Sequence, residues 1–252
     1  MLFGKYASRI SEAKYPSLHD QLAVAWCPAI QSPSGLTVYS HIGRANATLG
    51  GVDPTTCWGR TNGKNALITD GVNDYASIRV PLSLPFTFTI SGVFRSTGTF
   101  QTVVDSAEST WFFALLLNSG GQPYLFSGGN AFGPFSGQAV TYGSAATISA
   151  VIAAGRRELW LNGVRIGSDT NQTSMSGTLN ELFRLDPSLF HSKVDLFAAS
   201  VHKRALTASE LIRLNKEPEA IFAARRNVIG GSSGFQSAWI RPQSRVIGGG
   251  VG

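Results

Sequence analysis

Features that would place this chain in a membrane or in a secretory pathway are missing from its sequence. Only 14% of the 252 residues are charged, yet no apolar run approaches the roughly eighteen residues of a membrane-spanning helix. Residues 1–20 lack the apolar core and the small-residue cleavage site of a secretory signal. We therefore expect a protein that is made in the cytoplasm without a signal peptide and that does not span a membrane.

Cysteine is scarce as well, with Cys27 and Cys57 alone. Two cysteines cannot define the disulfide framework of a small secreted protein, and inside a cell the default state of cysteine is the free thiol. A disulfide between the two residues is the less favoured alternative. We expect two buried free thiols.

Motifs for metal binding and nucleophilic catalysis are absent. The four histidines, His19, His41, His191 and His202, show no metal-ligand spacing with one another or with a cysteine. A G-x-S-x-G match at 230–234 lies in a glycine-rich tail, whereas a nucleophile elbow must join a strand to a helix. The sequence therefore predicts no serine-hydrolase site and no required cofactor.

The residues that are abundant favour β-structure. The chain has 28 Gly, 11 Pro and 15 Phe, which suits short strands joined by tight turns. Strand candidates recur about every ten residues, a spacing typical of a sandwich or jelly roll. The candidates are 66–68, 76–80, 86–94, 99–105, 111–118, 122–127, 146–153, 158–161, 164–169 and 179–185.

Two strand features are especially informative. Asn162-Gly163 joins two of the candidates and predicts a type I′ hairpin, because these residues adopt positive φ at low cost. Phe86, Phe88 and Ile90 alternate with threonine and serine, which predicts a strand buried on one face.

One short helix follows the last strand, which we expect at 193–201. Thr207 with Glu210 three residues later fits a capping box that begins a helix at Ala208, and Pro218 ends it. Its narrow apolar stripe suffices to lie against a sheet but not to form a helical core.

Residues 193–222 resemble the C-terminal signature of laminin-G-like, concanavalin-A-like jelly-roll domains. There, a strand ends in an R-A-L turn and leads to s/t-x-x-E-I-x-x-L-x-x-x-P. The matching residues are Arg204, Ala205, Leu206, Thr207, Glu210, Leu211, Leu214 and Pro218. Further motifs stand in the family's order at 15–18 with 25–28, at 70–75 and at 159–165.

The resemblance covers residues 15–222 and implies an all-β, concanavalin-A-like jelly-roll sandwich with one short C-terminal helix and extended terminal arms. We divide the chain into an N-terminal arm at 1–20, the jelly-roll domain at 21–222 and a C-terminal arm at 223–252.

The C-terminal arm carries most of the net charge of +6. Residues 201–252 hold 8 Lys or Arg and 3 Asp or Glu, which gives a net charge of +5. Residues 1–200 hold 13 Lys or Arg and 12 Asp or Glu, which gives +1. Its basic and aromatic residues predict a segment that docks on a partner protein, with nucleic acid as the less favoured partner. The predicted docking residues are Arg225, Arg226, Phe235, Trp239, Arg241 and Arg245.

Glycosidases are the enzymes to test for in this fold family, because its glucanases place two glutamates about four residues apart on one strand. The seven glutamates of this chain are scattered, and the only close ones lie near the end of the helix. We therefore expect no enzymatic activity.

The resemblance also implies a candidate calcium site, since related lectin domains bind this ion with aspartates and loop carbonyls. Asp70, Asn73, Asp74 and Asp105 are the candidate ligands. We favour the alternative, in which Asp and Asn at a turn bond to their own backbone.

Two function classes remain. The first is a non-enzymatic structural protein of a virus particle, a phage capsid-decorating or tail-associated subunit that forms a homo-oligomer and docks on other virion proteins through its arms. The alternative is a carbohydrate-binding lectin module on a bacterial or phage surface, with or without calcium. Its stacking aromatics would be Trp111, Phe132 and Phe135.

Overall fold

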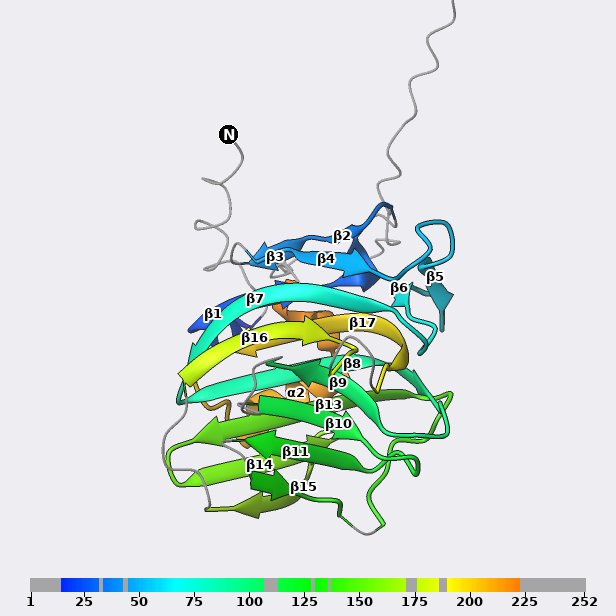
Figure 1. The fold of residues 1–252 in the computed structure, drawn as a ribbon. Helices are drawn as coiled ribbons and strands as arrows, with labels where there is room; N and C mark the ends of the chain where they lie inside the picture. Colours follow the sequence, from blue (N-terminus) through cyan, green and yellow to red (C-terminus); the bar gives the residue numbers. More distant parts are fainter. Residues whose placement is uncertain are drawn as a thin grey trace, which may run out of the picture.

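Two antiparallel β-sheets stack face to face, with one short helix on the outer side of one of them (Figure 1). The computed structural model describes residues 15–31, 34–42, 45–106, 113–127, 130–135, 137–170, 176–185 and 190–222. The predicted all-β jelly-roll sandwich with one short helix is confirmed. The C-terminal arm and most of the N-terminal arm lie outside the described residues, so the domain boundaries stay predictions.

The first sheet has nine strands, seven of them in the order β15-β14-β13-β8-β17-β1-β3, while β6 pairs with both β17 and β5. Its strands are β1 (Leu22–Trp26), β3 (Ser40–Ile42), β5 (Trp58–Thr61), β6 (Lys64–Ile68), β8 (Phe86–Arg95), β13 (Ala145–Ala153), β14 (Arg156–Leu161), β15 (Val164–Asp169) and β17 (Lys193–His202).

The second sheet has eight strands in the order β12-β11-β10-β9-β16-β7-β4-β2 and faces the viewer in Figure 1. Its strands are β2 (Thr37–Val38), β4 (Ala47–Gly50), β7 (Tyr75–Ser83), β9 (Gln101–Asp105), β10 (Phe113–Leu117), β11 (Pro123–Ser127), β12 (Asn130–Phe132) and β16 (Ser176–Leu182).

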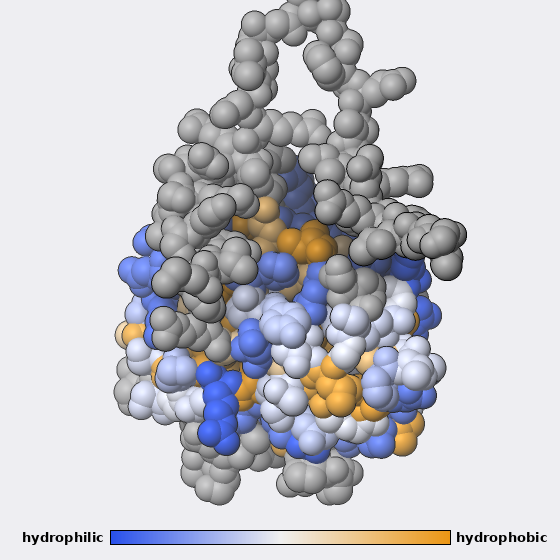
Figure 2. Space-filling view, turned by 90° about the horizontal axis from the view of Figure 1, so that it is seen from above, coloured by the Kyte–Doolittle hydropathy of each residue, from blue (hydrophilic) through white to orange (hydrophobic). Residues whose placement is uncertain are grey.

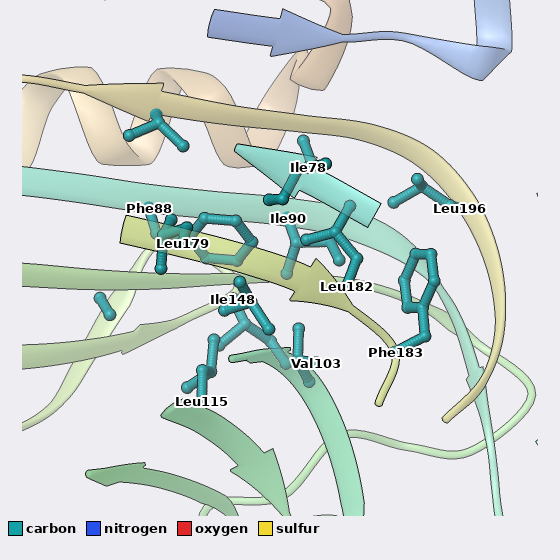
Figure 3. Close-up of a cluster of buried hydrophobic side chains, with 14 of the residues drawn as sticks. Ile78, Phe88, Ile90, Val103, Leu115, Ile148, Leu179, Leu182, Phe183 and Leu196 are labelled. Atoms are coloured by element: carbon teal, nitrogen blue, oxygen red, sulfur yellow. The ribbon is translucent and has the colours of Figure 1, made fainter. Parts of the chain in front are cut away.

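The hydrophobic core lies between the two sheets (Figure 3). Phe88, Ile90 and Ile148 of the nine-stranded sheet meet Leu115 and Leu179 of the eight-stranded sheet, and all five side chains are fully buried. Alternate residues along each strand point into this layer, as expected for two sheets packed as a sandwich. The remaining face of each sheet is therefore the place to look for function.

Strand β8 is buried on both faces, so the prediction of a strand buried on one face is wrong. The Thr87 hydroxyl donates to the carbonyl of Arg204 at 2.9 Å and accepts from the amide of Leu206 at 3.0 Å. Thr89 and Ser149 share a hydrogen bond of 3.0 Å. The cover comes from residues far along the chain, in α2 (Ala208–Lys216) and the 3-10 helix η4 (Pro218–Phe222).

The hairpin at Asn162-Gly163 and the helix that begins at Ala208, both predicted from local motifs, are confirmed. Asn162 and Gly163 have φ values of +51° and +76°, and Leu161 pairs with Val164 across the turn. Helix α2 begins at Ala208 behind a complete capping box formed by Thr207 and Glu210.

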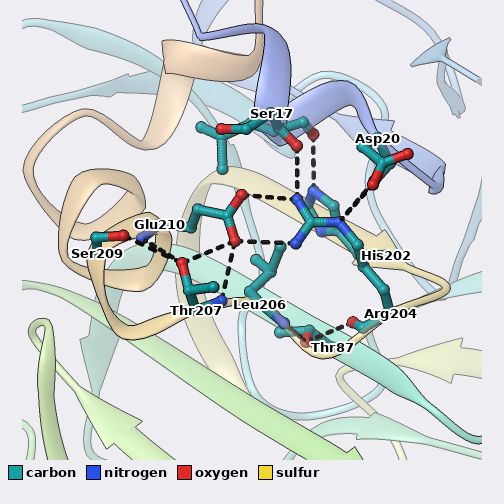
Figure 4. Close-up of polar contacts among 10 residues, drawn as sticks. Ser17, Asp20, Thr87, His202, Arg204, Leu206, Thr207, Ser209 and Glu210 are labelled. Carbon is teal, nitrogen blue, oxygen red and sulfur yellow. Dashed lines mark hydrogen bonds and ion pairs between the residues drawn. The ribbon is translucent and has the colours of Figure 1, made fainter.

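Arg204 ties the start of this helix to the N-terminal side of the domain (Figure 4). Its guanidinium donates to Glu210 at 2.7 and 2.9 Å and to the carbonyl of Asp20 at 3.0 Å. Hydrogen bonds from Arg204 and Thr207 outweigh burial and hold the pKa of Glu210 at about 2. The 3-10 helix η2 (Pro16–His19), within the predicted N-terminal arm, packs here through the buried Leu18.

All ten predicted strand ranges overlap observed strands, β6 to β11 and β13 to β16. The prediction omitted β1 to β5 and β12, which are five residues long or shorter. The described residues contain no helix that is long and apolar enough to cross a bilayer. Cys27, which precedes the 3-10 helix η3 (Pro28–Ile30), and Cys57 are both buried free thiols, as predicted.

Seen from the end that carries β2 and β4, the described residues show apolar side chains in separate patches among polar ones (Figure 2). Scattered apolar residues of this kind are normal on a protein surface.

Candidate functional site

A row of residues crosses the outer face of the eight-stranded sheet. The strand register aligns Thr48, Ser77, Glu181, Asp105, Ala114 and Phe126, from β4 through β7, β16, β9 and β10 to β11. Directly opposite residues in antiparallel pairs share a face. The next residues along these strands, such as Leu115 and Leu182, belong to the core, so the row points away from it. With strands about 4.8 Å apart, this outer-face row is about 24 Å long.

Four aromatic rings gather at the β11 end of the outer-face row. Tyr124 and Phe126 are stacked, with ring centroids 6.1 Å apart and planes 14° from parallel. Phe100 lies edge-on to Tyr124 and to Phe190, each at 5.9 Å, and is 40% exposed. We call these four residues the aromatic platform. Rings that are partly exposed and fixed by their neighbours offer flat apolar faces to a ligand.

Two carboxylates stand opposite each other at the centre of the outer-face row. Asp105 and Glu181 are paired across neighbouring strands. Arg184 donates its Nε to Glu181 at 2.8 Å and makes a second contact from Nη2 to the other carboxylate oxygen. The hydrogen bond to Glu181 raises the pKa of Arg184, and the guanidinium carbon lies 3.4 Å from the ring centroid of Tyr75.

This arrangement fixes the orientation of the charged groups. A bidentate guanidinium–carboxylate pair stacked on an aromatic ring has little freedom to rotate. Asp105 is only 3% exposed, whereas Glu181 and Arg184 are partly exposed. The side chain of Asn180 donates to the carbonyl of Ser106 next to it. The centre of the row thus presents preorganised hydrogen-bonding groups at Glu181, three strand spacings or about 14 Å from Phe126.

The structure separates the four predicted calcium ligands. Asp70, Asn73 and Asp74 share the turn between β6 and β7, whereas Asp105 lies in the outer-face row. Asp70 accepts from the amide of Val72 at 2.7 Å, and Asp74 accepts from the amide of Asp70 at 2.7 Å. Burial raises the pKa of the Asp74 carboxyl.

These bonds are the backbone contacts expected of Asp at a turn. In the described part of the chain, no three His, Cys, Asp or Glu side chains gather in a metal-binding arrangement. Calcium binding stays the less favoured alternative.

The predicted stacking aromatics lie elsewhere. Trp111 is outside the described residues. Phe132 is 7% exposed, with its ring 5.0 Å from Phe135 and 5.0 Å from the guanidinium carbon of Arg157. Phe135 packs so closely on Gly167 that a Cβ there would lie 2.1 Å from the ring. These two rings fill the space between the sheets and are not available to stack on a sugar. The rings of the aromatic platform are partly exposed.

Sequence reasoning missed the platform because its rings come from three separate segments. Tyr124 and Phe126 gave one usable signal, since they share a face of the predicted strand at 122–127. Phe100 and Phe190 reach them only through the fold. The docking residues Arg225, Arg226, Phe235, Trp239, Arg241 and Arg245 lie outside the described residues.

No protein-family model matches the chain, and no curated protein sequence matches it. Solved structures do. A sialidase of Trypanosoma rangeli in complex with the inhibitor DANA is 12% identical, with a TM-score of 0.65 over 86% of this chain. Only 38% of the sialidase is covered, so the chain spans little more than a third of its length.

Two further solved structures share the fold. Domain 4 of an extracellular arabinanase from Geobacillus stearothermophilus, in complex with arabinotriose, is 14% identical with a TM-score of 0.56. The match covers 77% of this chain and 98% of that domain. The binding domain of botulinum neurotoxin serotype D is 9% identical with a TM-score of 0.62, covering 79% of this chain and 51% of that one. At these identities the likeness establishes the fold.

The comparisons contradict the prediction that the protein is not an enzyme. The same sandwich occurs in a sialidase and in a domain of an arabinanase, which are enzymes. The prediction rested on finding no pair of glutamates on one strand. The fold instead brings Asp105 and Glu181 together from two strands that are far apart in the sequence, so the test on single strands was inadequate.

Proposed function

We propose that the protein binds carbohydrate on the outer face of the eight-stranded sheet, which was the alternative function predicted from the sequence. The observation that carries the proposal is that the aromatic platform and the Glu181–Arg184 pair lie on the same outer face of one sheet, three strand spacings apart. The arabinanase domain solved with arabinotriose has the same fold and supports the choice of ligand class.

Each part of the site has a distinct task in this proposal. The faces of Tyr124 and Phe126 stack against the apolar C–H surface of a sugar ring. Glu181, Arg184 and Ser77 exchange hydrogen bonds with sugar hydroxyls, and the carboxylate–guanidinium pair provides both acceptors and donors in a fixed geometry. Asp105 is buried next to Glu181 on the neighbouring strand.

The proposal is tested by Tyr124→Ala on a glycan array, with the wild-type protein beside it, in calcium and in chelator. We expect binding by the wild type and loss of at least about tenfold in affinity in the variant, because a central aromatic hot spot contributes about 2 kcal/mol or more. A wild-type protein that binds no glycan in either condition would contradict the proposal.

Glycoside hydrolysis is a second candidate, favoured by the pairing of Asp105 with Glu181. Carboxyl groups on directly opposed residues come close enough for the two-carboxylate mechanism of retaining glycosidases. Incubation of the bound glycan with wild type and with Glu181→Gln tests it. Release of reducing sugar by the wild type alone supports hydrolysis, and no release by either protein excludes it for that glycan.

A further inference from the structure

An open groove of about 600 Å³ runs beside β7 at the edge of the sandwich. Strand β4 pairs with β7 only as far as Ser77, so the β7 edge beyond that residue faces the groove. Ala23 and Val24 of β1 line it from the other sheet. The buried Val24, Ile78 and Val80 give it an apolar floor.

The rim of this edge groove is positively charged. Arg79 and Lys203 both line it and are both exposed. Neither takes part in an ion pair with another described residue, and no acidic side chain is among the described residues that line the groove. Asn46, Thr48 and Ser77 add hydrogen-bonding groups. A cationic rim above an apolar floor suits an anion, because a low-dielectric wall strengthens the attraction between opposite charges.

An added β-strand from another protein is a poorer fit to the same groove. The exposed edge of β7 contains Pro81, which lacks an N–H, and the charged Arg79. Both are devices that discourage strand pairing at a sheet edge. A small charged group is therefore favoured over an extended peptide.

The edge groove is continuous with the outer-face row. Thr48 and Ser77 belong to both, and Ser77 is four strand spacings, about 19 Å, from Phe126. A ligand that spans this distance is an oligosaccharide, with one sugar on the aromatic platform and another at the groove.

We propose that the edge groove binds an acidic group, a carboxylate or a sulfate, of the glycan that the outer face binds. The inference rests on the proposed function and specifies its ligand as an acidic oligosaccharide. The guanidinium of Arg79 matches a carboxylate or sulfate with two parallel hydrogen bonds, while Lys203 contributes a point charge.

The test uses a glycan array that pairs neutral oligosaccharides with their sialylated, uronic-acid and sulfated counterparts. The probes are the wild type, Tyr124→Ala and the double variant Arg79→Gln/Lys203→Gln. The control variants Arg156→Gln and Lys216→Gln each remove an exposed cation away from the groove. Unchanged thermal unfolding of every variant confirms that it is folded.

The double variant should lose about tenfold or more in affinity for acidic glycans, since hydrogen bonds to charged groups contribute about 1.5–3 kcal/mol. It should keep the affinity for neutral ones. Wild-type binding of acidic glycans should also weaken with salt, because exposed charges are screened. Comparison of the sialylated, uronic-acid and sulfated glycans identifies which anion the groove binds.

The outcomes separate the two proposals. If the double variant discriminates acidic from neutral glycans as well as the wild type does, the groove inference is overturned, while loss of binding in Tyr124→Ala still supports the platform. If Tyr124→Ala changes nothing but the double variant loses acidic ligands, the platform account is overturned and the groove is a separate anion site. A wild type that prefers neutral glycans overturns the inference directly.

Discussion

At the scale of single residues, Arg157 joins the two sheets across the core. Its side chain is 1% exposed and donates to Asp169 at 2.8 Å, to the Ser127 hydroxyl at 3.1 Å and to the carbonyl of Asn130 at 3.0 Å. Ser127 and Asn130 belong to β11 and β12, whereas Arg157 belongs to β14. A buried charge with its donors occupied in this way fixes how the sheets sit on each other.

Arg157→Ala should therefore lower the free energy of unfolding by roughly 2–4 kcal/mol, because it removes a buried guanidinium together with its hydrogen bonds to Asp169, Ser127 and Asn130. Urea denaturation measures the change. The neighbouring Arg156 is 49% exposed, and Arg156→Ala should stay within about 0.5 kcal/mol of the wild type. Equal losses in the two variants would show that Arg157 has no such role.

At the scale of elements, three histidines lie around η4 and η2, which pack near the outer side of the nine-stranded sheet. The His41 ring lies 4.9 Å from Phe222 of η4. Burial lowers the pKa of His19, which also bonds to the backbone of Ile221, and burial lowers the pKa of His41. Burial likewise lowers the pKa of His202 to about 4, and its Nε2 lies 2.9 Å from the carbonyl of Leu18.

Acid should therefore destabilise the fold through these residues. A histidine whose pKa is lowered in the folded state binds protons more readily in the unfolded state. Its contribution to the free energy of unfolding is therefore present above about pH 6.5 and is lost as the pH falls toward 4. For His202 the loss is about 3 kcal/mol. Urea unfolding at pH 7, 5.5 and 4 measures this loss. The substitution His202→Gln should make the free energy of unfolding depend less steeply on pH. Arg204 and Glu210 also face His202, but the Glu210 pKa of about 2 places its own effect at lower pH. A slope unchanged in His202→Gln would contradict the account.

Elements defined by neighbouring residues were predictable from the sequence. The capping box of Thr207 and Glu210 and the Asn162-Gly163 turn depend on contacts within four residues, so residue type alone specifies them. The burial of β8 was not predictable, because its cover comes from residues more than a hundred positions later. The residues of the candidate site could not be predicted from the sequence for the same reason. Asp105 and Glu181 are adjacent only through the pairing of β9 with β16.

At the scale of the whole molecule, the two sheets have different outer faces. The nine-stranded sheet is covered by α2 and η4, so its serines and threonines bond inside the protein. The eight-stranded sheet carries the outer-face row and the aromatic platform. We assign binding to the eight-stranded side for this reason. The virion location, the homo-oligomer and the virion partners stay predictions.

The C-terminal arm supplies a separate test of the virion prediction. Deletion of residues 223–252 should leave thermal unfolding unchanged, because the buried hydrophobic clusters of the described residues lie within residues 18–221, and should abolish incorporation into a virus particle. A full-length variant with Gln at Arg225, Arg226, Arg241 and Arg245 separates charge from length. Normal incorporation of the deleted protein would rule out a docking arm.

The central claim is that the aromatic platform on the eight-stranded sheet binds a glycan. The most direct measurement is calorimetric titration of a glycan identified on the array into wild type, Tyr124→Ala and the control Tyr39→Ala, whose side chain is 57% exposed outside the platform. We predict that Tyr124→Ala weakens binding at least about tenfold while Tyr39→Ala binds as the wild type does. Equal affinity of all three proteins for the glycan would contradict the account.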